Sequence, residues 1–308
     1  MNSAIITGPT GAIGMALIEE LLKNNIEVIA VIRPNSLRTD RIKEGRNLIK
    51  IESDLSEISK LPKEIRKRGL KPEVFYHFAW DGTFGNSRNN MYGQNLNIQY
   101  ALNAVDAAAD MGCRCFVGAG SQAEYGRYEG KLSEDTPVFP ENGYGIAKLA
   151  AGYMTRIQAE QKGIDHIWTR ILSIYGPYDG EKTLVSSLIS QLLKGKKPSC
   201  TKGEQKWDYL YSKDAAYAFR LLGEKGISGK TYCIGSGEAK PLKEYINTIR
   251  DEIDPSLEIG FGDIEYAPKQ VMHLCADIES LKEDTGFSRR YSFKEGIRQT
   301  IDWYNRSN

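Results

Sequence analysis

Apolar positions in the first half of the chain switch repeatedly between short continuous runs and helical spacing. The short runs predict strands at Ala4–Thr7, Glu27–Ile32, Leu48–Ile51, Val74–Phe78 and Arg114–Gly118. The helical spacing predicts helices at Ile13–Lys23, Arg38–Lys43, Leu61–Arg68 and Gln94–Met111. This alternation predicts an α/β fold with a doubly wound parallel sheet and right-handed crossovers. Runs that are apolar on both faces, such as 28–32, indicate helices on both sides of the sheet.

The pattern changes after residue 175. A long helix at Tyr144–Lys162 and a strand near Asp165–Leu172 complete the first region. Beyond them the spacing predicts strands at Trp207–Tyr211 and Thr231–Ile234, and helices at Val185–Leu193, Leu242–Ile253, Ile278–Asp284 and Phe293–Tyr304. We therefore expect a larger lobe of residues 1–175, with strands returning near 207–235, and a smaller mixed C-terminal lobe of residues 176–206 and 236–308.

Composition narrows the classes of partner. The 308 residues include 41 Lys plus Arg and 40 Asp plus Glu, so the chain is nearly neutral. This balance disfavours nucleic-acid binding and a polybasic membrane surface. The sequence contains no apolar run of about 18 residues and no secretion signal, so we expect a cytoplasmic protein. Its three histidines and five cysteines have no metal-ligand spacing, and we expect no metal site.

A glycine-rich segment, 7–14 (TGPTGAIG), follows the first predicted strand and opens the first helix. Gly8 permits a tight turn, Gly11 lets the backbone approach a pyrophosphate, and Gly14 allows close packing of helix on strand. The amide groups at the start of the helix favour an anion. The segment, with Thr10, Ala12 and Ile13 between its glycines, is therefore predicted to bind a dinucleotide.

The residues after the second strand indicate which dinucleotide binds. An acidic residue there selects NAD, whereas a basic one accommodates the additional phosphate of NADP. The strand is followed by Arg33, Asn35, Ser36 and Arg38, with no carboxylate before Arg38. NADP(H) is therefore favoured, and NAD(H) remains possible. After the third strand, the pair Asp54–Leu55 either contacts the adenine or caps a helix.

Three further residues have the chemistry of a proton-transfer site. Ser121 follows the fifth strand, at the sheet edge where ligands bind. Tyr144 and Lys148 are four residues apart and share one helical face. A nearby ammonium favours the phenolate form of a tyrosine, and a serine hydroxyl holds the reacting oxygen. We predict that these three residues support hydride transfer.

These motifs, taken in order, resemble the extended short-chain dehydrogenase/reductases of nucleotide-sugar metabolism. The matching segments are 7–14, 77–80 (HFAW), 118–126 (GAGSQAEYG), 144–148 (YGIAK), 170–177 (RILSIYGP), 207–216 (WDYLYSKDAA), 231–238 (TYCIGSGE) and 293–304 (FKEGIRQTIDWY). The resemblance implies a Rossmann-type domain with a small nucleotide-sugar domain. It also implies that Tyr144 is the acid/base and that Lys148 binds the nicotinamide ribose.

The resemblance implies further contacts. For the cofactor they are Phe78, Ala79, Trp80, Ile171, Ser173 and Ile174, and for the substrate they are Ser121, Gln122, Glu124, Ser173, Lys206 and Trp207. It also implies a homodimer through a four-helix bundle made by 95–111 and 144–162 of each chain.

Departures from the family pattern limit the chemistry. In the 4,6-dehydratases the catalytic Thr is followed by Asp and Glu (T-D-E), and in the GDP-fucose synthases the catalytic Ser begins the motif S-x-C. Here Gln122 and Ala123 follow Ser121. Neither side chain exchanges a proton in the required role. What remains is 4-keto reduction, 4-epimerisation or alcohol oxidation. Many family members have an arginine at the position of Trp207 that pairs with the substrate phosphate. Tryptophan cannot form this pair, and the neighbouring Lys206 is the cation expected there instead.

The basic residues after the second strand favour a 4-keto reductase, and segments 118–126 and 207–211 are also similar to CDP-abequose and CDP-paratose synthases. The alternatives are a 4-epimerase with tightly bound NAD and a non-catalytic protein that senses NADP.

Overall fold

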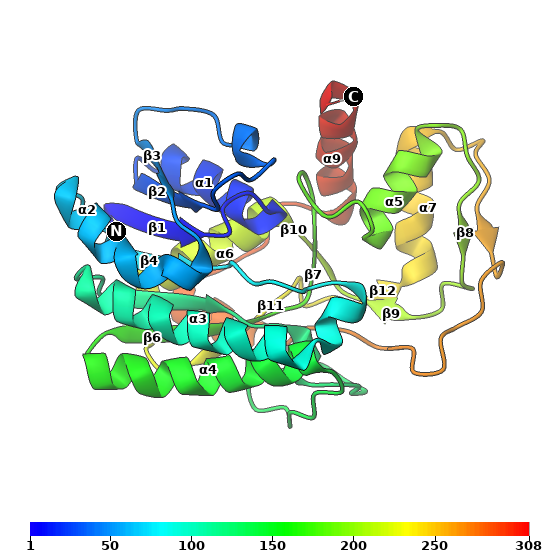
Figure 1. Cartoon of the computed structure of the whole chain (residues 1–308). Helices are drawn as coiled ribbons and strands as arrows, with labels where there is room; N and C mark the ends of the chain where they lie inside the picture. Colours follow the sequence, from blue (N-terminus) through cyan, green and yellow to red (C-terminus); the bar gives the residue numbers. More distant parts are fainter. Residues whose placement is uncertain (308) are drawn as a thin grey trace.

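A computed structural model describes residues 1–307 and contains a seven-stranded parallel sheet (Figure 1). The strand order is β11-β6-β5-β4-β1-β2-β3. These strands are β1 (Ser3–Thr7), β2 (Glu27–Ile32), β3 (Leu48–Glu52), β4 (Val74–His77), β5 (Cys115–Ala119), β6 (Asp165–Ile171) and β11 (Thr231–Ile234). The order reverses at β1, because β2 and β4 pair with its two edges. The predicted doubly wound, Rossmann-type α/β sheet is confirmed.

Helices cover both faces of the sheet, as the two-sided apolar strands predict. They are α1 (Ala12–Lys23), α2 (Leu61–Lys67), α3 (Met91–Asp110), α4 (Gly143–Lys162) and α6 (Ser212–Lys225). The remaining helices are α5 (Leu184–Leu192), α7 (Leu242–Ile253), α8 (Glu279–Thr285) and α9 (Phe293–Ser307). Ala4 and Ile6 of β1 pack in the same cluster as residues of α1 and α6. Ile5 points the other way and packs with residues of α2 and α3. In Figure 1, α3 and α4 run alongside each other on that second face.

The smaller group of elements, at the right of Figure 1, packs around α5, α7 and α9. Three two-stranded sheets accompany these helices, pairing β10 with β7, β12 with β9, and β13 with β8. Their strands are β7 (Ser173–Tyr175), β8 (Ser199–Cys200), β9 (Lys206–Trp207), β10 (Tyr209–Tyr211), β12 (Lys240–Pro241) and β13 (Gly260–Phe261). Asn308, the last residue of the predicted smaller lobe, lies outside the described residues.

The short strands β7, β8, β12 and β13 were not predicted, and three longer elements also differ from the sequence prediction. The predicted helix Arg38–Lys43 is only a 3-10 turn at Thr39–Arg41 (η1), because Ile42 alone in that stretch is buried and no apolar face supports a helix. The predicted strand Trp207–Tyr211 is divided between β9 and β10, with different partners.

Helix α6 was not predicted. Ala215, Phe219 and Leu222 have helical spacing and are buried, so a signal existed. The helix follows β10 directly at Ser212, with no glycine or proline to separate the two patterns.

Among the helices of residues 1–307, none has the length and the apolar character that a membrane span requires.

Candidate active site

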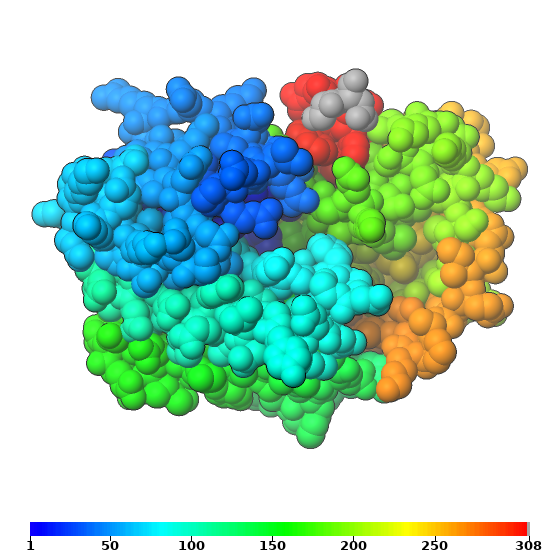
Figure 2. Space-filling model, viewed as in Figure 1, coloured from blue at the N-terminus to red at the C-terminus, as the bar shows by residue number. Residues whose placement is uncertain are grey.

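A cleft of about 570 Å³ lies at the carboxyl ends of the central strands, beside the smaller group of elements. Its volume is in the range of small-molecule sites. Its walls come from the loop between β1 and α1, the segment after β4, the end of β5, helix α4, and residues 171–185. Figure 2 shows a recess between the dark blue N-terminal atoms, the cyan atoms and the green atoms. This position matches the topological switch point of an open α/β sheet.

The glycine-rich segment forms one wall of the cleft through Gly8, Gly11, Ala12, Ile13 and Gly14. Gly8 has φ +69°, a conformation that favours glycine. Gly11 precedes α1 with no side-chain cap, so the first amide groups of the helix remain available to an anion. A Cβ on Gly11 would meet no atom closer than 3.9 Å, whereas one on Gly14 would collide with Gly8 and Pro9. The wall therefore has room and amide donors for a pyrophosphate.

The other expected residues of this region lie outside the cleft lining. Thr10 presents its carbonyl to Arg41, whose Nη1 donates at 2.9 Å. Ala79 packs its backbone against Gly8. Arg33, Asn35 and Arg38 are exposed at the end of β2.

Ser36 belongs to the same turn, since its amide donates to the Arg33 carbonyl. Asp54 caps the 3-10 helix η2 (Leu55–Lys60) by accepting from Ser56 N at 3.0 Å. The hydrogen bonds from Ser56 lower the pKa of Asp54. The capping alternative for Asp54 is therefore present, and its contact with adenine stays a prediction.

Ser121, Tyr144 and Lys148 all line the cleft. Ser121 precedes the 3-10 helix η4 (Gln122–Glu124), and its Oγ accepts from Ala123 N at 3.2 Å. This bond uses a lone pair of the hydroxyl and leaves its proton free to donate. Tyr144 and Lys148 lie on the first two turns of α4, which begins with Asn142 as N-cap. The structure thus brings together three residues that the sequence placed on two different segments.

Lys148 is 3% exposed, and its environment sets its charge. Its Nζ donates to the Ala119 carbonyl at 2.6 Å and lies 3.7 Å from the centroid of the Trp80 ring. Burial lowers the pKa of Lys148 to about 7, while the Glu124 carboxylate opposes that change. An ammonium at this position would stabilise a phenolate on Tyr144.

Tyr144 has a second cation beside it that the sequence analysis did not identify. The Arg88 guanidinium lies 4.6 Å from the centroid of the Tyr144 ring. Burial raises the pKa of Tyr144, and hydrogen bonding to Ser121 and the charge of Arg88 lower it in part. Arg88 follows β4 in a 3-10 helix (Gly85–Asn89), and nothing in its local sequence indicates this contact.

The remaining walls include Phe78, Trp80, Ile171, Ser173 and Ile174, together with Trp207. The Trp207 indole N–H donates to Ser173 Oγ at 2.7 Å, so this donor is not free for a substrate phosphate. The neighbouring Lys206 is exposed and is not part of the lining.

Two expected substrate residues, Gln122 and Glu124, do not line the cleft. Glu124 is fully buried and forms an ion pair with Arg170, with Nε and Oε2 2.9 Å apart.

Asp179 is a cleft residue that the sequence analysis missed. Its Oδ1 accepts from Gly180 N at 2.7 Å, and its Oδ2 accepts from Thr183 Oγ1 at 2.8 Å. Burial raises the pKa of Asp179 to about 6. Tyr209 and Phe84 complete this end of the cleft. A single carboxylate among aromatic groups suits a ligand with hydrogen-bond donors.

Comparison of the amino-acid sequence with known proteins identifies the family of the chain. The model of the NAD dependent epimerase/dehydratase family matches residues 4–235. A dTDP-glucose 4,6-dehydratase of Xanthomonas campestris pv. campestris is 25% identical over 329 residues, which cover 99% of this chain and 93% of the relative. An uncharacterized UDP-glucose epimerase of Bacillus subtilis, YtcB, is 27% identical over 308 residues, covering 96% of each chain.

Solved structures share the fold. A UDP-N-acetylglucosamine 4-epimerase from Methanobrevibacter ruminantium M1 superimposes with a TM-score of 0.89 at 22% identity, covering 100% of this chain and 99% of the other. A UDP-glucose 4-epimerase from Thermotoga maritima gives a TM-score of 0.84 at 22% identity, covering 99% of each chain.

Proposed function

The chain belongs to the NAD dependent epimerase/dehydratase family, and we propose that within this family it reduces a 4-keto nucleotide sugar with NADPH. The observation that carries this proposal is the cleft itself. Ser121, Tyr144 and Lys148 line it, whereas the residues after Ser121 are Gln122 and Ala123. The positions after Ser121 therefore lack the acidic pair that dehydration uses, and Tyr144 is the proton donor that we assign. This argues against the activity named for the Xanthomonas relative.

The roles follow from the positions of the side chains. When bound, reduced nicotinamide supplies the hydride that converts the C4 carbonyl to an alcohol. Tyr144 donates its phenolic proton to the carbonyl oxygen, and the free Ser121 O–H holds that oxygen by a hydrogen bond. Lys148 and Arg88 stabilise the phenolate that Tyr144 leaves. The hydride and the proton together complete the reduction.

Each of the two lobes would bind one of the two ligands, the dinucleotide or the sugar nucleotide. We assign the dinucleotide to residues 1–175 with 207–235, and the sugar nucleotide to residues 176–206 and 236–308. The glycine-rich loop at one end of the cleft and residues 179–185 at the other support this division.

The choice of NADP(H) over NAD(H) rests on Arg33 and Arg38, which are exposed at the end of β2 where a 2′-phosphate would lie.

The assembly we propose is a homodimer through α3 and α4. Four large apolar side chains of α4 are 45–51% exposed: Ile146, Tyr153, Met154 and Ile157. Met91, Tyr92 and Leu96 of α3 are also exposed. Two adjacent helices with such faces suit burial against the same pair from a second copy.

A Tyr144→Phe substitution tests the reaction. It removes the proton donor and keeps the ring, so turnover should fall by about 100-fold or more while the melting temperature stays near the wild-type value. The assay follows NADPH oxidation with a panel of UDP-, CDP-, GDP- and TDP-linked 4-keto sugars. Tyr153→Phe, on the exposed side of the same helix, is the control and should keep full turnover. Wild-type turnover in Y144F would contradict the mechanism.

A 4-epimerase with tightly bound NAD is the second function that we consider, because the Bacillus subtilis relative is named as a UDP-glucose epimerase. The same assay separates the two. An epimerase would contain NAD as purified and would interconvert its substrates without added NADPH. NADP binding without turnover of any substrate would instead favour a non-catalytic protein.

A further inference from the structure

Glu124 lies in the loop that presents Ser121 to the cleft, and its side chain is 0% exposed. Its Oε1 accepts from the Ser121 backbone N–H at 2.8 Å. In return, Ser121 Oγ accepts from Ala123 N, so the two residues form a reciprocal capping box. Both the backbone and the hydroxyl of Ser121 are thereby held by this short turn.

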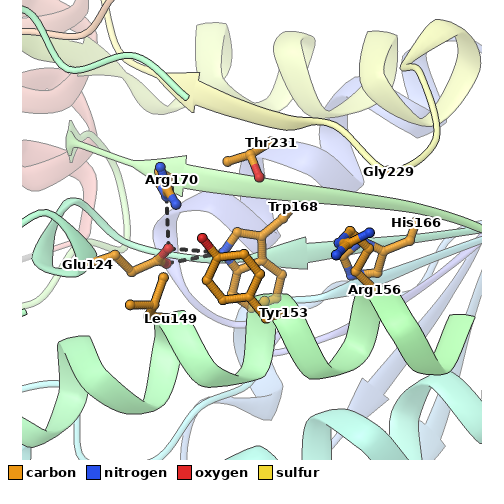
Figure 3. Close-up of a pocket in the computed structure, with 10 residues that line it drawn as sticks. Glu124, Leu149, Tyr153, Arg156, His166, Trp168, Arg170, Gly229 and Thr231 are labelled. Carbon is orange, nitrogen blue, oxygen red and sulfur yellow. Dashed lines mark hydrogen bonds and ion pairs between the residues drawn. The ribbon is translucent and has the colours of Figure 1, made fainter. Parts of the chain in front are cut away.

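The Glu124 carboxylate is itself fixed by the neighbouring strand β6. Arg170 Nε donates to Oε2 at 2.9 Å, and Trp168 Nε1 donates to Oε1 at 3.1 Å. Figure 3 shows these contacts, with Arg170 and Trp168 pointing toward Glu124 beside a cavity of about 220 Å³. Arg170 and Trp168 are both buried. Strand β6 of the main sheet therefore anchors the turn that carries Ser121.

Gly120 makes this approach possible. A Cβ at position 120 would collide with Glu124 Oε1, Trp168 Nε1 and the Thr169 carbonyl. The Gly120 amide also donates to the Thr169 carbonyl at 2.6 Å. The residue before Ser121 is thus held against β6 as well.

Fixing a turn with a buried ion pair is unfavourable in desolvation free energy, because removing two charges from water costs several kcal/mol per ion. The negative charge of the Glu124 carboxylate, however, also acts electrostatically on other residues of the site. Burial raises the pKa of Glu124, and the Arg170 guanidinium together with the hydrogen bonds from Ser121 and Trp168 opposes this. Its ion-pair partner is Arg170 from β6, and Arg156 of α4 lines the same cavity. The charge of Glu124 also raises the pKa of Lys148 and of Tyr144, against the larger effect of burial on Lys148 and together with it on Tyr144.

We propose that Glu124 is a positioning residue of this site: its carboxylate, locked by Arg170 and Trp168, fixes Ser121 and supports the ammonium of Lys148. This inference rests on the proposed function in one respect only, the use of Ser121 and Lys148 in turnover. Glu124 does not line the cleft and so is not assigned a contact with substrate or cofactor.

A Glu124→Gln substitution tests the inference. Glutamine keeps the size and one acceptor but loses the charge, and its amide N–H opposes the Arg170 donor. We expect kcat to fall about 10- to 100-fold, because a small displacement of a positioned group is costly, while the Kd for NADP is unchanged. In protein labelled with [ε-¹³C]lysine, the NMR titration of Lys148, assigned with Lys148→Arg, should show a pKa below the wild-type value.

Glu20→Gln is the matched control. Glu20 on α1 is also a buried carboxylate, paired with Arg220 at 2.9 Å and Arg290 at 3.2 Å, and it does not line the cleft. E20Q should lower the melting temperature without changing kcat or the Lys148 titration. Wild-type kcat in E124Q, or a lowered kcat with an unmoved Lys148 titration, would overturn the proposal.

If E124Q does not fold, the double variant Glu124→Gln/Arg170→Met removes both charges and avoids an unpaired buried arginine. It should reproduce the loss of kcat and the lowered Lys148 pKa, and an unmoved titration would overturn the proposal. If the wild-type protein turns over no nucleotide sugar, the proposed function fails. The Lys148 titration, which needs no turnover, then decides the inference alone: a lowered pKa supports it, and an unmoved one overturns it.

Discussion

Asp179 brings a carboxylate into a cleft that is expected to hold two anionic ligands. Its two hydrogen-bond donors, Gly180 N and Thr183 Oγ1, are local, and burial raises its pKa to about 6. A negative charge here would repel a carboxylate on the substrate. A sugar with hydroxyl or amino donors near this end of the cleft is therefore a better match than a uronic acid.

The raised pKa predicts a pH effect on stability. The folded state holds the Asp179 proton more tightly than the unfolded state does. The contribution of this proton is therefore fully present below about pH 4 and is lost as the pH rises through about 6. In chemical denaturation without ligand, wild type should lose up to about 2 kcal/mol relative to Asp179→Asn between pH 4.5 and 7.5.

Asp277→Asn is the control for this measurement, because it makes the same substitution at another partly buried carboxyl, outside the cleft. A difference between wild type and D179N that is the same at both pH values would contradict the assignment.

The residues of the candidate site fall into two groups: those that a sequence motif marks, and those that only the folded chain brings into contact. Ser121, Tyr144 and Lys148 could be predicted because their spacing and order along the chain are a motif. Asp179 could not, since no local pattern marks it. The contacts of Glu124 with Trp168 and Arg170 cross from one strand end to another, and only the folded sheet sets that pairing. Arg88 reaches Tyr144 in the same way.

At the scale of elements, the end of β2 is the feature with the clearest consequence. Arg33 is exposed there, directly after the last residue of the strand. Arg33→Asp should lower the ratio of kcat/KM for NADPH to that for NADH by about 10-fold or more. The reason is that the substitution replaces the proposed partner of the 2′-phosphate with an acceptor for the 2′-hydroxyl. Steady-state kinetics with both cofactors measure the ratio.

Arg46→Asp makes the same charge change before the start of β3, at the amino edge of the sheet, and should leave the ratio unchanged. An unaltered ratio in R33D would show that the basic end of β2 does not select the cofactor.

The strands also show which elements a pattern of apolar residues can predict and which it cannot. The seven strands of the sheet are long or apolar enough to be predicted within a residue or so at each end. The strand predicted at Trp207–Tyr211 divides because Asp208 turns inward, where its carboxylate accepts from Ser236, Gly237 and Ala276 amides. Those partners come from distant segments, so the aromatic run alone gave no sign of the break.

For the whole molecule, the exposed apolar faces of α3 and α4 predict the state of assembly. Placing charges there, as Met154→Glu/Ile157→Glu, should convert a dimer to a monomer, because each buried charge without a partner opposes association. Light scattering after size-exclusion chromatography gives the mass. Ile227→Glu, at an isoleucine that is 45% exposed outside these helices, should leave the mass unchanged. A wild-type monomer would refute the proposed assembly.

The order of the strands also bears on how the protein is made. The outer edge of β6 is covered by β11, which is synthesised only after α5 and α6. Until then a strand that is buried in the finished fold presents unpaired backbone groups, the template on which chains aggregate. Since N-terminal parts fold first during synthesis, the emerging Rossmann half passes through this stage every time. Products that stop between β6 and Thr231 would keep that open edge, so we expect premature termination in this stretch to yield aggregates rather than a working half.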